Sequence, residues 1–245
     1  MPGGPKPLGA GFRPLISTVL RGLDATLDDR AEAKIVIWLD LLASWNQKID
    51  LTAARSAEEL VDLMLVDALV LARHEPSGAA VVDVGTGAGA PGLALGIVRP
   101  DLALTLVEPL AKRVAFLRTV LGHLGAASTA ETGAGPPPTP STATSAHSEP
   151  RSETLPRVYR GKGEALADQG ALYDTAVARA TLAPAAWLEL GGRLVRPSGA
   201  VWVLLAREPA PDIRGWEIAA DDRYTWPLTG AERRAVRYRR AASSP

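Results

Sequence analysis

Cysteine is absent from the 245 residues of the sequence. This absence excludes disulfide bonds, thiolate metal sites and every catalytic mechanism that uses a cysteine nucleophile. Histidine occurs only three times, and the spacing of these residues does not suggest a metal-binding set. We therefore predict that the protein binds no metal, and we interpret the histidines as surface side chains: His74, His123 and His147.

An excess of charge of either sign is also lacking, since Lys plus Arg and Asp plus Glu each number 27. Without a strong net field to attract a polyanion, any contact with nucleic acid must come from a local patch. A long uncharged apolar run is missing, and so is a basic and apolar signal segment at the start. We expect a cytoplasmic protein that makes no contact with a membrane.

The first third of the chain combines a proline-rich and glycine-rich start with two helical patterns. Residues 1–14 contain four prolines and four glycines and little to bury, which predicts a flexible tail. In residues 15–75, apolar side chains recur at intervals of three and four, which is typical of amphipathic helices. We predict that this segment forms a helical cap in which the tryptophans belong to the core. Its apolar stripes are Ile35, Trp38, Leu42 and Trp45, and then Leu60, Leu63, Met64, Ala68 and Leu71.

From residue 79 onward, short apolar runs alternate with helical segments. The β-branched run AAVVDVG starts there, a second apolar run covers residues 102–108, and a helical pattern covers residues 110–124. Strands that alternate with helices in this way indicate a parallel sheet with right-handed crossovers. We predict an α/β protein with a Rossmann-like core over residues 79–245. The basic run ERRAVRYRR over residues 232–240 is expected to be an edge strand of this core.

Residues 128–156 interrupt this alternation. They are mainly Ser, Thr, Pro, Gly and Ala, and Leu155 is their only large apolar side chain. Such a segment cannot bury enough apolar surface to offset the entropy lost when it is ordered. We predict a disordered surface insertion within one domain, and the alternative is a linker between two domains.

The stretch VVDVGTGAGAPGL over residues 81–93 carries the strongest chemical signal. A strand leads to Gly85, Gly87 and Gly89, and glycines permit a sharp turn and a close approach of the backbone to a ligand. The turn alone is shared by nicotinamide, flavin and methyl-donor proteins. Asp83 precedes it, and a carboxylate there favours the positively charged methionine moiety of S-adenosylmethionine over a pyrophosphate. We predict S-adenosylmethionine as the cofactor, with a nicotinamide cofactor as the alternative.

Glu108 ends the second predicted strand, 23 residues after Gly85. A carboxylate at this place can accept hydrogen bonds from both hydroxyls of a ribose. The alternative interpretation is a solvated carboxylate at the end of a strand.

The lack of certain catalytic groups in the sequence limits which methyl acceptors are compatible with it. Methyl transfer from a sulfonium is an in-line displacement, in which the enzyme mainly aligns the reactants. Guanine N7 presents an in-plane lone pair and needs no proton removal, so the lack of an obvious catalytic His or Cys is compatible with this acceptor. Exocyclic amines commonly require a clamp of two prolines and an aromatic residue. The only proline cluster, Pro136 to Pro138, falls in the predicted insertion, which disfavours amine acceptors.

Three motifs together resemble the RsmG (GidB) family of 16S ribosomal RNA guanine-N7 methyltransferases, from about Trp38 to the C-terminus. WNQKIDLTAARSAEEL is similar to the family's W-N-x-x-x-N-L-T-x-x-R-D-P-x-E-M. DVGTGAGAPGLALGIVRPD is similar to D-V-G-T/S-G-x-G-F/L-P-G-I-P-L-A-I-x-R-P, and LVEPLAKRVAFLRTV to L-x-D-S-x-x-K-K-x-x-F-L. The resemblance implies a Rossmann-like, S-adenosylmethionine-dependent methyltransferase whose partner is 16S rRNA or the small ribosomal subunit.

The resemblance also implies roles for individual residues on the cofactor side. Gly85 and Ala90 match positions in the turn that contact the cofactor, and Glu108 replaces an aspartate of the family. Gly163 and Glu164 match a segment that faces the adenine.

On the acceptor side, Arg179 matches an arginine expected near the methionine end of the cofactor or the incoming base, and the alternative is a surface ion pair. Leu63 and Met64 stand where the family has arginine and histidine, and Leu205 where it has lysine, with Arg207 two places later. These departures leave two alternatives open: a diverged methyltransferase for another RNA or a small molecule, and a non-catalytic protein that binds S-adenosylmethionine. The C-terminal arginines either follow a phosphate backbone or solubilise an edge strand: Arg233, Arg234, Arg237, Arg239 and Arg240.

Overall fold

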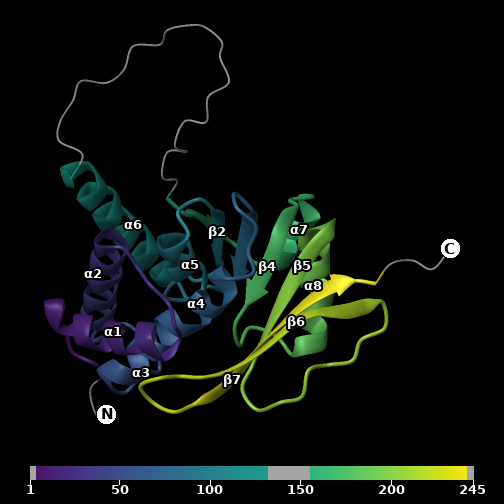
Figure 1. The fold of residues 1–245 in the computed structure, drawn as a ribbon. Coiled ribbons are helices and arrows are strands. Elements are labelled where there is room, and N and C mark those ends of the chain that lie inside the picture. Colours follow the sequence, from purple (N-terminus) through teal and green to yellow (C-terminus); the bar gives the residue numbers. More distant parts are fainter. Residues whose placement is uncertain (1–3, 132–154, 242–245) are drawn as a thin grey trace, which may run out of the picture.

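The computed structural model describes residues 4–131 and 155–241 of the chain. Within them lies a seven-stranded sheet in the order β3-β2-β1-β4-β5-β7-β6 (Figure 1). Strands β3, β2, β1, β4 and β5 pair in parallel, whereas β7 runs antiparallel to both β5 and β6. This topology confirms the predicted α/β, Rossmann-like sheet. The strands are β1 (Ala80–Val84), β2 (Ala103–Glu108), β3 (Arg157–Arg160), β4 (Tyr173–Ala178), β5 (Val195–Leu205), β6 (Trp216–Thr225) and β7 (Glu232–Arg240).

Helices that connect the parallel strands cover both faces of the sheet. Val81 packs in one apolar cluster with side chains of α5 and α6, and Val82 packs in the other with side chains of α7 and α8. Successive side chains of a strand point to opposite faces, so one apolar run can serve both clusters. The helices are α5 (Gly92–Val98), α6 (Ala111–Glu131), α7 (Gly163–Asp168) and α8 (Pro184–Leu194).

The N-terminal helices gather on the side of the sheet that α5 and α6 cover (Figure 1). Trp38 of α2 is fully buried against the turn that follows β1, and its Nε1 donates a hydrogen bond to Ala88 O over 3.0 Å. Trp45 meets Phe116 edge to face, with ring centroids 5.6 Å apart. Both contacts agree with the interpretation of the tryptophans as core residues. These helices are η1 (Gly9–Phe12), α1 (Arg13–Gly22), α2 (Asp29–Asn46), α3 (Ala57–Val61), η2 (Asp62–Val66) and α4 (Asp67–Ala72).

Side-chain caps determine where two of the N-terminal helices begin. Asp28 accepts a hydrogen bond from Ala31 N over 2.7 Å at the start of α2, and Ser56 accepts one from Glu59 N over 3.2 Å at the start of α3. Each cap satisfies an amide that has no partner within its helix.

The start of the chain is folded, so the prediction of a flexible tail over residues 1–14 is wrong for the part that the structure describes. The chain enters η1 and α1, and Phe12 is fully buried. Pro14 fits the first turn of α1, where an amide hydrogen has no helical partner. Arg13 also pairs with Glu32 of α2 over 2.8 Å. The buried Phe12 ring anchors the segment despite its high proline and glycine content.

Both ends of the predicted disordered insertion over residues 128–156 belong to the described structure, so the prediction is wrong for them. Helix α6 continues to Glu131, because residues 128–131 contain neither proline nor glycine to end it. The chain is described again from residue 155, and Pro156 is buried. Residues 132–154 lie outside the described residues, together with His147.

The basic run over residues 232–240 was expected to be an edge strand, and this prediction is wrong. The run forms β7, which is hydrogen-bonded to β5 on one side and to β6 on the other. The edge strand at this end of the sheet is β6, which was not predicted because its many charged residues obscure the apolar alternation. An edge strand tolerates this polarity, since one of its sides faces solvent. Figure 1 shows β6 and β7 as a long hairpin at the bottom of the view.

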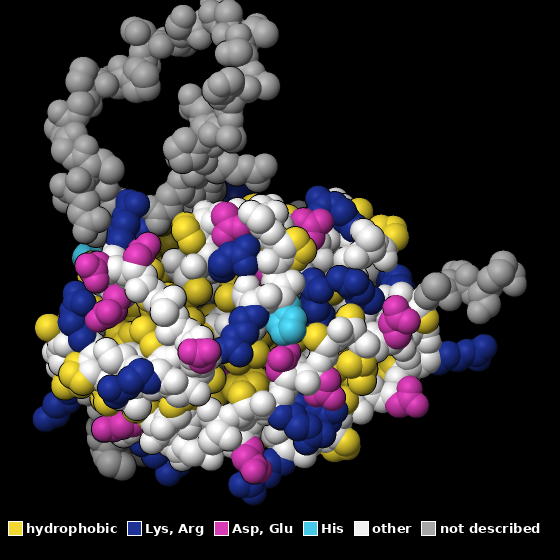
Figure 2. Space-filling model, in the orientation of Figure 1, with side chains coloured by type: hydrophobic (Ala, Val, Ile, Leu, Met, Phe, Trp, Pro, Cys, Tyr) yellow, Lys and Arg dark blue, Asp and Glu magenta, His cyan; other side chains and the backbone are white. Residues whose placement is uncertain are grey.

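The surface bears out the balanced composition. On the face drawn in Figure 2, basic and acidic side chains are interspersed rather than gathered by sign. Among residues 4–131 and 155–241, no helix is both long and apolar enough to cross a membrane. In the same residues, no cluster of three or more His, Asp and Glu side chains has the arrangement of a metal site.

Candidate functional site

A cavity of about 470 Å³ opens at the carboxyl ends of β1, β2 and β4. Parallel α/β sheets bind ligands at this place, where the strand order reverses, and we call it the switch-point cavity. Five of the nine residues that the sequence predicts as cofactor ligands line it: Gly85, Glu108, Gly163, Glu164 and Arg179. The other four lie outside the lining: Asp83, Gly87, Gly89 and Ala90.

The turn after β1 requires its glycines. Gly85, Gly87 and Gly89 have φ angles of 71°, 62° and 110°, in the region that side chains with a Cβ rarely adopt. A Cβ on Gly85 would also lie 2.6 Å from Thr181 Oγ1, and a Cβ on Gly89 would lie 2.9 Å from the Cβ of Leu93. The turn therefore packs closely against both the segment after β4 and helix α5.

Asp83 lies beneath this turn rather than in the cavity wall. Its Oδ2 accepts hydrogen bonds from Thr86 Oγ1 over 2.6 Å and from Gly92 N over 2.8 Å. Its Oδ1 is buried without a hydrogen-bond partner among the described residues. Complete burial raises the pKa of Asp83 to about 6, although the two hydrogen bonds act in the opposite direction. The expectation that this carboxylate faces a charged ligand thus needs correction, because the side chain fastens the turn to the start of α5.

Glu108 is held at the cavity by the backbone on both of its sides. Its Oε2 accepts a hydrogen bond from Gly87 N over 3.0 Å, and its Oε1 accepts one from Leu110 N over 2.9 Å. The side chain is almost fully buried, and Arg113 Nη1 lies 3.9 Å from Oε2. A carboxylate has about four acceptor sites, so Glu108 keeps the capacity to accept further hydrogen bonds from a ligand. Gly87 acts on the site through this contact, although it does not line the cavity.

The opposite wall comes from the start of α7. A Cβ on Gly163 would lie 2.7 Å from Cγ1 of Val84, so the helix approaches β1 more closely than another residue would allow. This close packing brings Lys162 and Glu164 to the rim of the cavity.

Arg179 follows β4 and is held by two segments far away in the sequence. Its Nη1 donates hydrogen bonds to Leu63 O and, over 3.1 Å, to Oδ2 of Asp67. The Asp67 carboxylate is buried, and its Oδ1 accepts a hydrogen bond from Tyr224 Oη over 2.8 Å. Burial, and then the nearby Asp67 charge, raise the pKa of Tyr224 far above its usual value, so the hydroxyl remains a donor. Arg179 is therefore a positioned side chain and not a surface ion pair.

Arg179 also forms part of a second cavity. This neighbouring cavity has a volume of about 410 Å³ and shares Arg179, Ala180 and Leu182 with the switch-point cavity. The two cavities therefore meet at the segment that follows β4.

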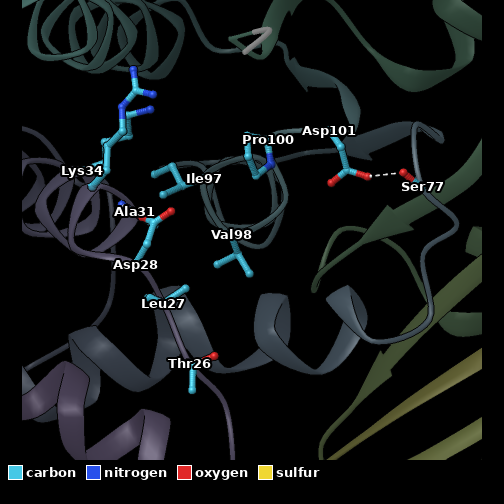
Figure 3. Close-up of a pocket in the computed structure, with 11 residues that line it drawn as sticks. Thr26, Leu27, Asp28, Ala31, Lys34, Ser77, Ile97, Val98, Pro100 and Asp101 are labelled. Carbon is cyan, nitrogen blue, oxygen red and sulfur yellow. Dashed lines mark hydrogen bonds between the residues drawn. The ribbon is translucent and has the colours of Figure 1, made fainter. Parts of the chain in front are cut away.

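The cavity drawn in Figure 3, of about 450 Å³, belongs to the other end of the sheet. Ser77 precedes β1 and Asp101 precedes β2, so both lie at the amino ends of the parallel strands. The Asp101 carboxylate accepts hydrogen bonds from Ser77 Oγ and Gly78 N over 3.1 Å and from Arg99 over 2.8 Å. The Arg99 hydrogen bonds lower the pKa of Asp101 well below its usual value. These hydrogen bonds stabilise the loops that precede β1 and β2. None of the predicted site residues lines this cavity.

Comparison with known proteins shows which family the chain resembles. Residues 31–131 match the model of the GidB family, described as rRNA small subunit methyltransferase G. The ribosomal RNA small subunit methyltransferase G of Xanthomonas axonopodis pv. citri is 35% identical over 215 residues, which cover 85% of this chain and 88% of the relative. The protein of the same name from Anaeromyxobacter dehalogenans is 30% identical over 240 residues, which cover 95% and 100%.

The chain belongs to the ribosomal RNA small subunit methyltransferase G family. Solved structures agree on the fold of this methyltransferase. The structure of MtNAS in complex with MTA and tNA is 15% identical, covers 93% of this chain and 82% of that chain, and superposes with a TM-score of 0.51.

This member of the methyltransferase G family differs from the family motifs at residues that line the neighbouring cavity. Leu63 and Leu205 line that cavity, so apolar side chains stand where the resemblance implies cations. Met64 is buried and does not reach the surface.

The site also contains residues that no sequence motif marks. Thr181 lies against the turn, and its Oγ1 donates a hydrogen bond to Val84 O over 3.1 Å. Tyr224 comes from β6, the strand that was missed. Asp67 lies in α4, within the segment predicted as helical, where the sequence does not mark it as a site residue. Each acquires its role from contacts between distant segments, and no local motif marks it.

Proposed function

We propose that the protein transfers the methyl group of S-adenosylmethionine to N7 of a guanine in 16S ribosomal RNA. Its membership in the methyltransferase G family supports the reaction class. The observation that carries the proposal is the switch-point cavity, where the glycine turn and the fixed Glu108 carboxylate share one wall.

The residues of the switch-point cavity fit S-adenosylmethionine. Glu108 would accept hydrogen bonds from the ribose hydroxyls, since its remaining acceptor sites are not used by the protein. Gly163 and Glu164 would border the adenine, and Arg179 would border the methionine end. When bound, this cofactor supplies an electrophilic methyl group on a sulfonium.

The residues of the chain contribute mainly alignment. Arg179 lies in the walls of both cavities, where a cofactor and an acceptor would meet. Asp67 and the Leu63 carbonyl fix its orientation, which reduces the freedom that has to be lost on binding. Guanine N7 requires no base, and His74 instead pairs with Asp222 over 2.8 Å and meets the Trp202 ring edge to face.

The proposal can be tested with purified protein, S-adenosylmethionine labelled in its methyl group, and small ribosomal subunits from a strain that lacks the gene. We expect the label in 7-methylguanosine after the 16S rRNA is digested to nucleosides. Calorimetric titration with S-adenosylmethionine and with NADH is the control, and we expect binding of the first only. Tight binding of S-adenosylmethionine without label in 7-methylguanosine would overturn the proposed acceptor.

The apolar lining of the neighbouring cavity favours a second candidate. Leu63 and Leu205 there suit a diverged methyltransferase that acts on another RNA or a small molecule. The same assay separates the two, because the label would then appear in a different nucleoside or outside the RNA. Binding without any transfer would identify a non-catalytic protein that binds S-adenosylmethionine.

A further inference from the structure

The neighbouring cavity continues into a third cavity, of about 340 Å³, at the β6–β7 hairpin. The two share Ala206, Glu208, Tyr224 and Arg233. We call the third one the arginine cavity, after the residues that dominate its lining: Arg207, Arg223, Arg233 and Arg234. The switch-point, neighbouring and arginine cavities therefore form one continuous series.

We propose that the neighbouring and arginine cavities together bind the acceptor nucleotide of the RNA, the base in the first and a phosphate in the second. This inference rests on the proposed function, because it assigns the acceptor side of the same reaction. It follows from three observations: the walls of the neighbouring cavity, an unpartnered donor in that wall, and the charge of the arginine cavity.

The walls of the neighbouring cavity suit a flat, partly apolar ligand. Leu63, Leu182 and Leu205 contribute apolar surface, and Arg179 adds hydrogen-bond donors at the border with the switch-point cavity. The volume of about 410 Å³ lies within the usual range for small-ligand sites. An acceptor base must reach the methyl group in the switch-point cavity, and a base in the neighbouring cavity lies next to it at Arg179.

Trp226 provides the second observation. It is 4% exposed and lines the neighbouring cavity, yet its Nε1 has no hydrogen-bond partner among the described residues. A buried donor without a partner costs free energy, and a ligand acceptor that reached Nε1 would recover it. Guanine carries such an acceptor in O6, next to N7. The guanidinium of Arg233 lies 4.0 Å from the centre of the Trp226 ring and keeps this wall in place.

The arginine cavity provides the third observation, because four arginines face two glutamates in its lining. Arg234 is neutralised by Asp221 through hydrogen bonds of 2.7 and 2.5 Å. Arg207 is 84% exposed and lies 3.6 Å from Glu232. Arg223 is exposed, and its charge acts on Asp221, whose carboxylate already binds Arg234. Arg207 and Arg223 can turn toward a phosphate, since neither is held by a buried contact.

Arg207 also explains how an RNA contact is retained although Leu205 is apolar. The resemblance implies a lysine at the position of Leu205, and the nearest cation, Arg207, lies two residues later in the arginine cavity. The positive charge is therefore displaced toward the β6–β7 hairpin rather than lost.

The first test uses the full-length protein with Arg207→Ala and Arg223→Ala combined, and Arg193→Ala as the control. Arg193 is an exposed arginine on α8 that pairs with Asp168. We expect the double variant to raise the KM for small ribosomal subunits at least about tenfold, and the control to leave it within about twofold. Affinity for S-adenosylmethionine, measured by calorimetry, should be unchanged in both.

A readout that does not depend on methylation is the salt dependence of binding to single-stranded 16S rRNA fragments. Loss of each phosphate contact should reduce the slope of log affinity against log salt by about 0.7. Arg223→Lys alone keeps the charge and should leave the slope close to that of the wild type. An unchanged slope and KM in the double variant would overturn the arginine cavity as a phosphate site. If the wild type bound S-adenosylmethionine without methylating RNA, the proposed function would fail, and the slope would still decide the phosphate site.

Trp226→Phe tests the base site. This variant keeps an aromatic ring beneath Arg233, removes the N–H donor and shortens the buried side chain from an indole to a phenyl ring. We expect kcat/KM for small ribosomal subunits to fall about fivefold while affinity for S-adenosylmethionine stays close to that of the wild type. The melting temperature should fall, because the phenyl ring fills less of the buried site than the indole. An unchanged kcat/KM would contradict the assignment of the base to the neighbouring cavity.

Discussion

The switch-point cavity and the neighbouring cavity lie side by side but are built in different ways. The first depends on contacts between short segments that adjacent strands bring together, such as the hydrogen bond from Gly87 to Glu108. The second depends on pairs far apart in the sequence: Arg179 reaches Asp67 across 112 residues, and Tyr224 reaches Asp67 across 157. The comparison teaches that the cofactor side follows from a local motif, whereas the acceptor side exists only once the whole chain has folded.

Removal of the Glu108 carboxylate should have the largest effect and should be confined to the cofactor side. We expect Glu108→Ala to weaken binding of S-adenosylmethionine about 100-fold, because two hydrogen bonds to a charged acceptor are lost. Calorimetric titration measures this change. Glu189→Ala removes the same charge from an exposed position on α8 and should change the affinity less than about twofold. A loss below about threefold in Glu108→Ala would show that Glu108 does not hold the ligand.

Release of Arg179 should affect the acceptor side with little effect on the cofactor. In Asp67→Asn, Arg179 and Tyr224 lose the charge of their shared acceptor. We expect kcat for methyl transfer to fall about 30-fold while affinity for S-adenosylmethionine changes less than about threefold. Tyr224→Phe removes only the hydroxyl group and should lower kcat about threefold. An equal loss of kcat and cofactor affinity in Asp67→Asn would erase the distinction between the two sides.

On the cofactor side, the buried Asp83 carboxylate makes a pH-dependent contribution to the free energy of unfolding. Its pKa is about 6 in the folded protein, against an ordinary value of 3.8 for an aspartate, so the folded protein binds the proton first as the pH falls. The contribution of Asp83 to the free energy of unfolding therefore decreases as the pH rises from about 4 to about 6.

Urea denaturation of the wild type and of Asp83→Asn at pH 5 and pH 7.5 measures this contribution. The wild type should lose roughly 1 kcal/mol more than the variant between the two pH values, because the folded protein holds the Asp83 proton at pH 5 and releases it by pH 7.5. The same pH dependence in both proteins would mean that Asp83 is not the titrating group.

Loss of the hydrogen bond between the helical cap and the turn should have the smallest effect. Trp38→Phe removes the donor to Ala88 O and keeps most of the buried ring. We expect a loss of about 1 kcal/mol in the free energy of unfolding, together with a small loss of cofactor affinity. Trp45→Phe, at a half-buried ring without this hydrogen bond, is the matched control. Equal effects of the two substitutions would show that the hydrogen bond contributes nothing to the turn.

The sequence predicts most of the core, since alternating strands and helices determine the parallel sheet and the glycine turn determines its ligand-binding end. It does not predict the position of β7, because β6 is too polar to be detected and only the pairing of both strands shows which one is the edge. It also misplaces Asp83. A carboxylate two residues before a turn can point into the cavity or beneath it, and only the hydrogen bond from Gly92 decides between them.

The remaining site residues could not be predicted because their roles arise from tertiary contacts. Tyr224 and Trp226 belong to or follow a strand that was not recognised, and Thr181 acquires its role from the close approach of Gly85. Phe12 shows the same limit at the N-terminus, where one buried ring outweighs a composition typical of a tail.

A crystal structure of the protein with S-adenosylmethionine tests the central claim most directly. We predict electron density for the cofactor in the switch-point cavity, with the ribose hydroxyls on the Glu108 carboxylate and the adenine beside Gly163. Density for the cofactor elsewhere, or a cofactor in this cavity without any contact to Glu108, would contradict the account.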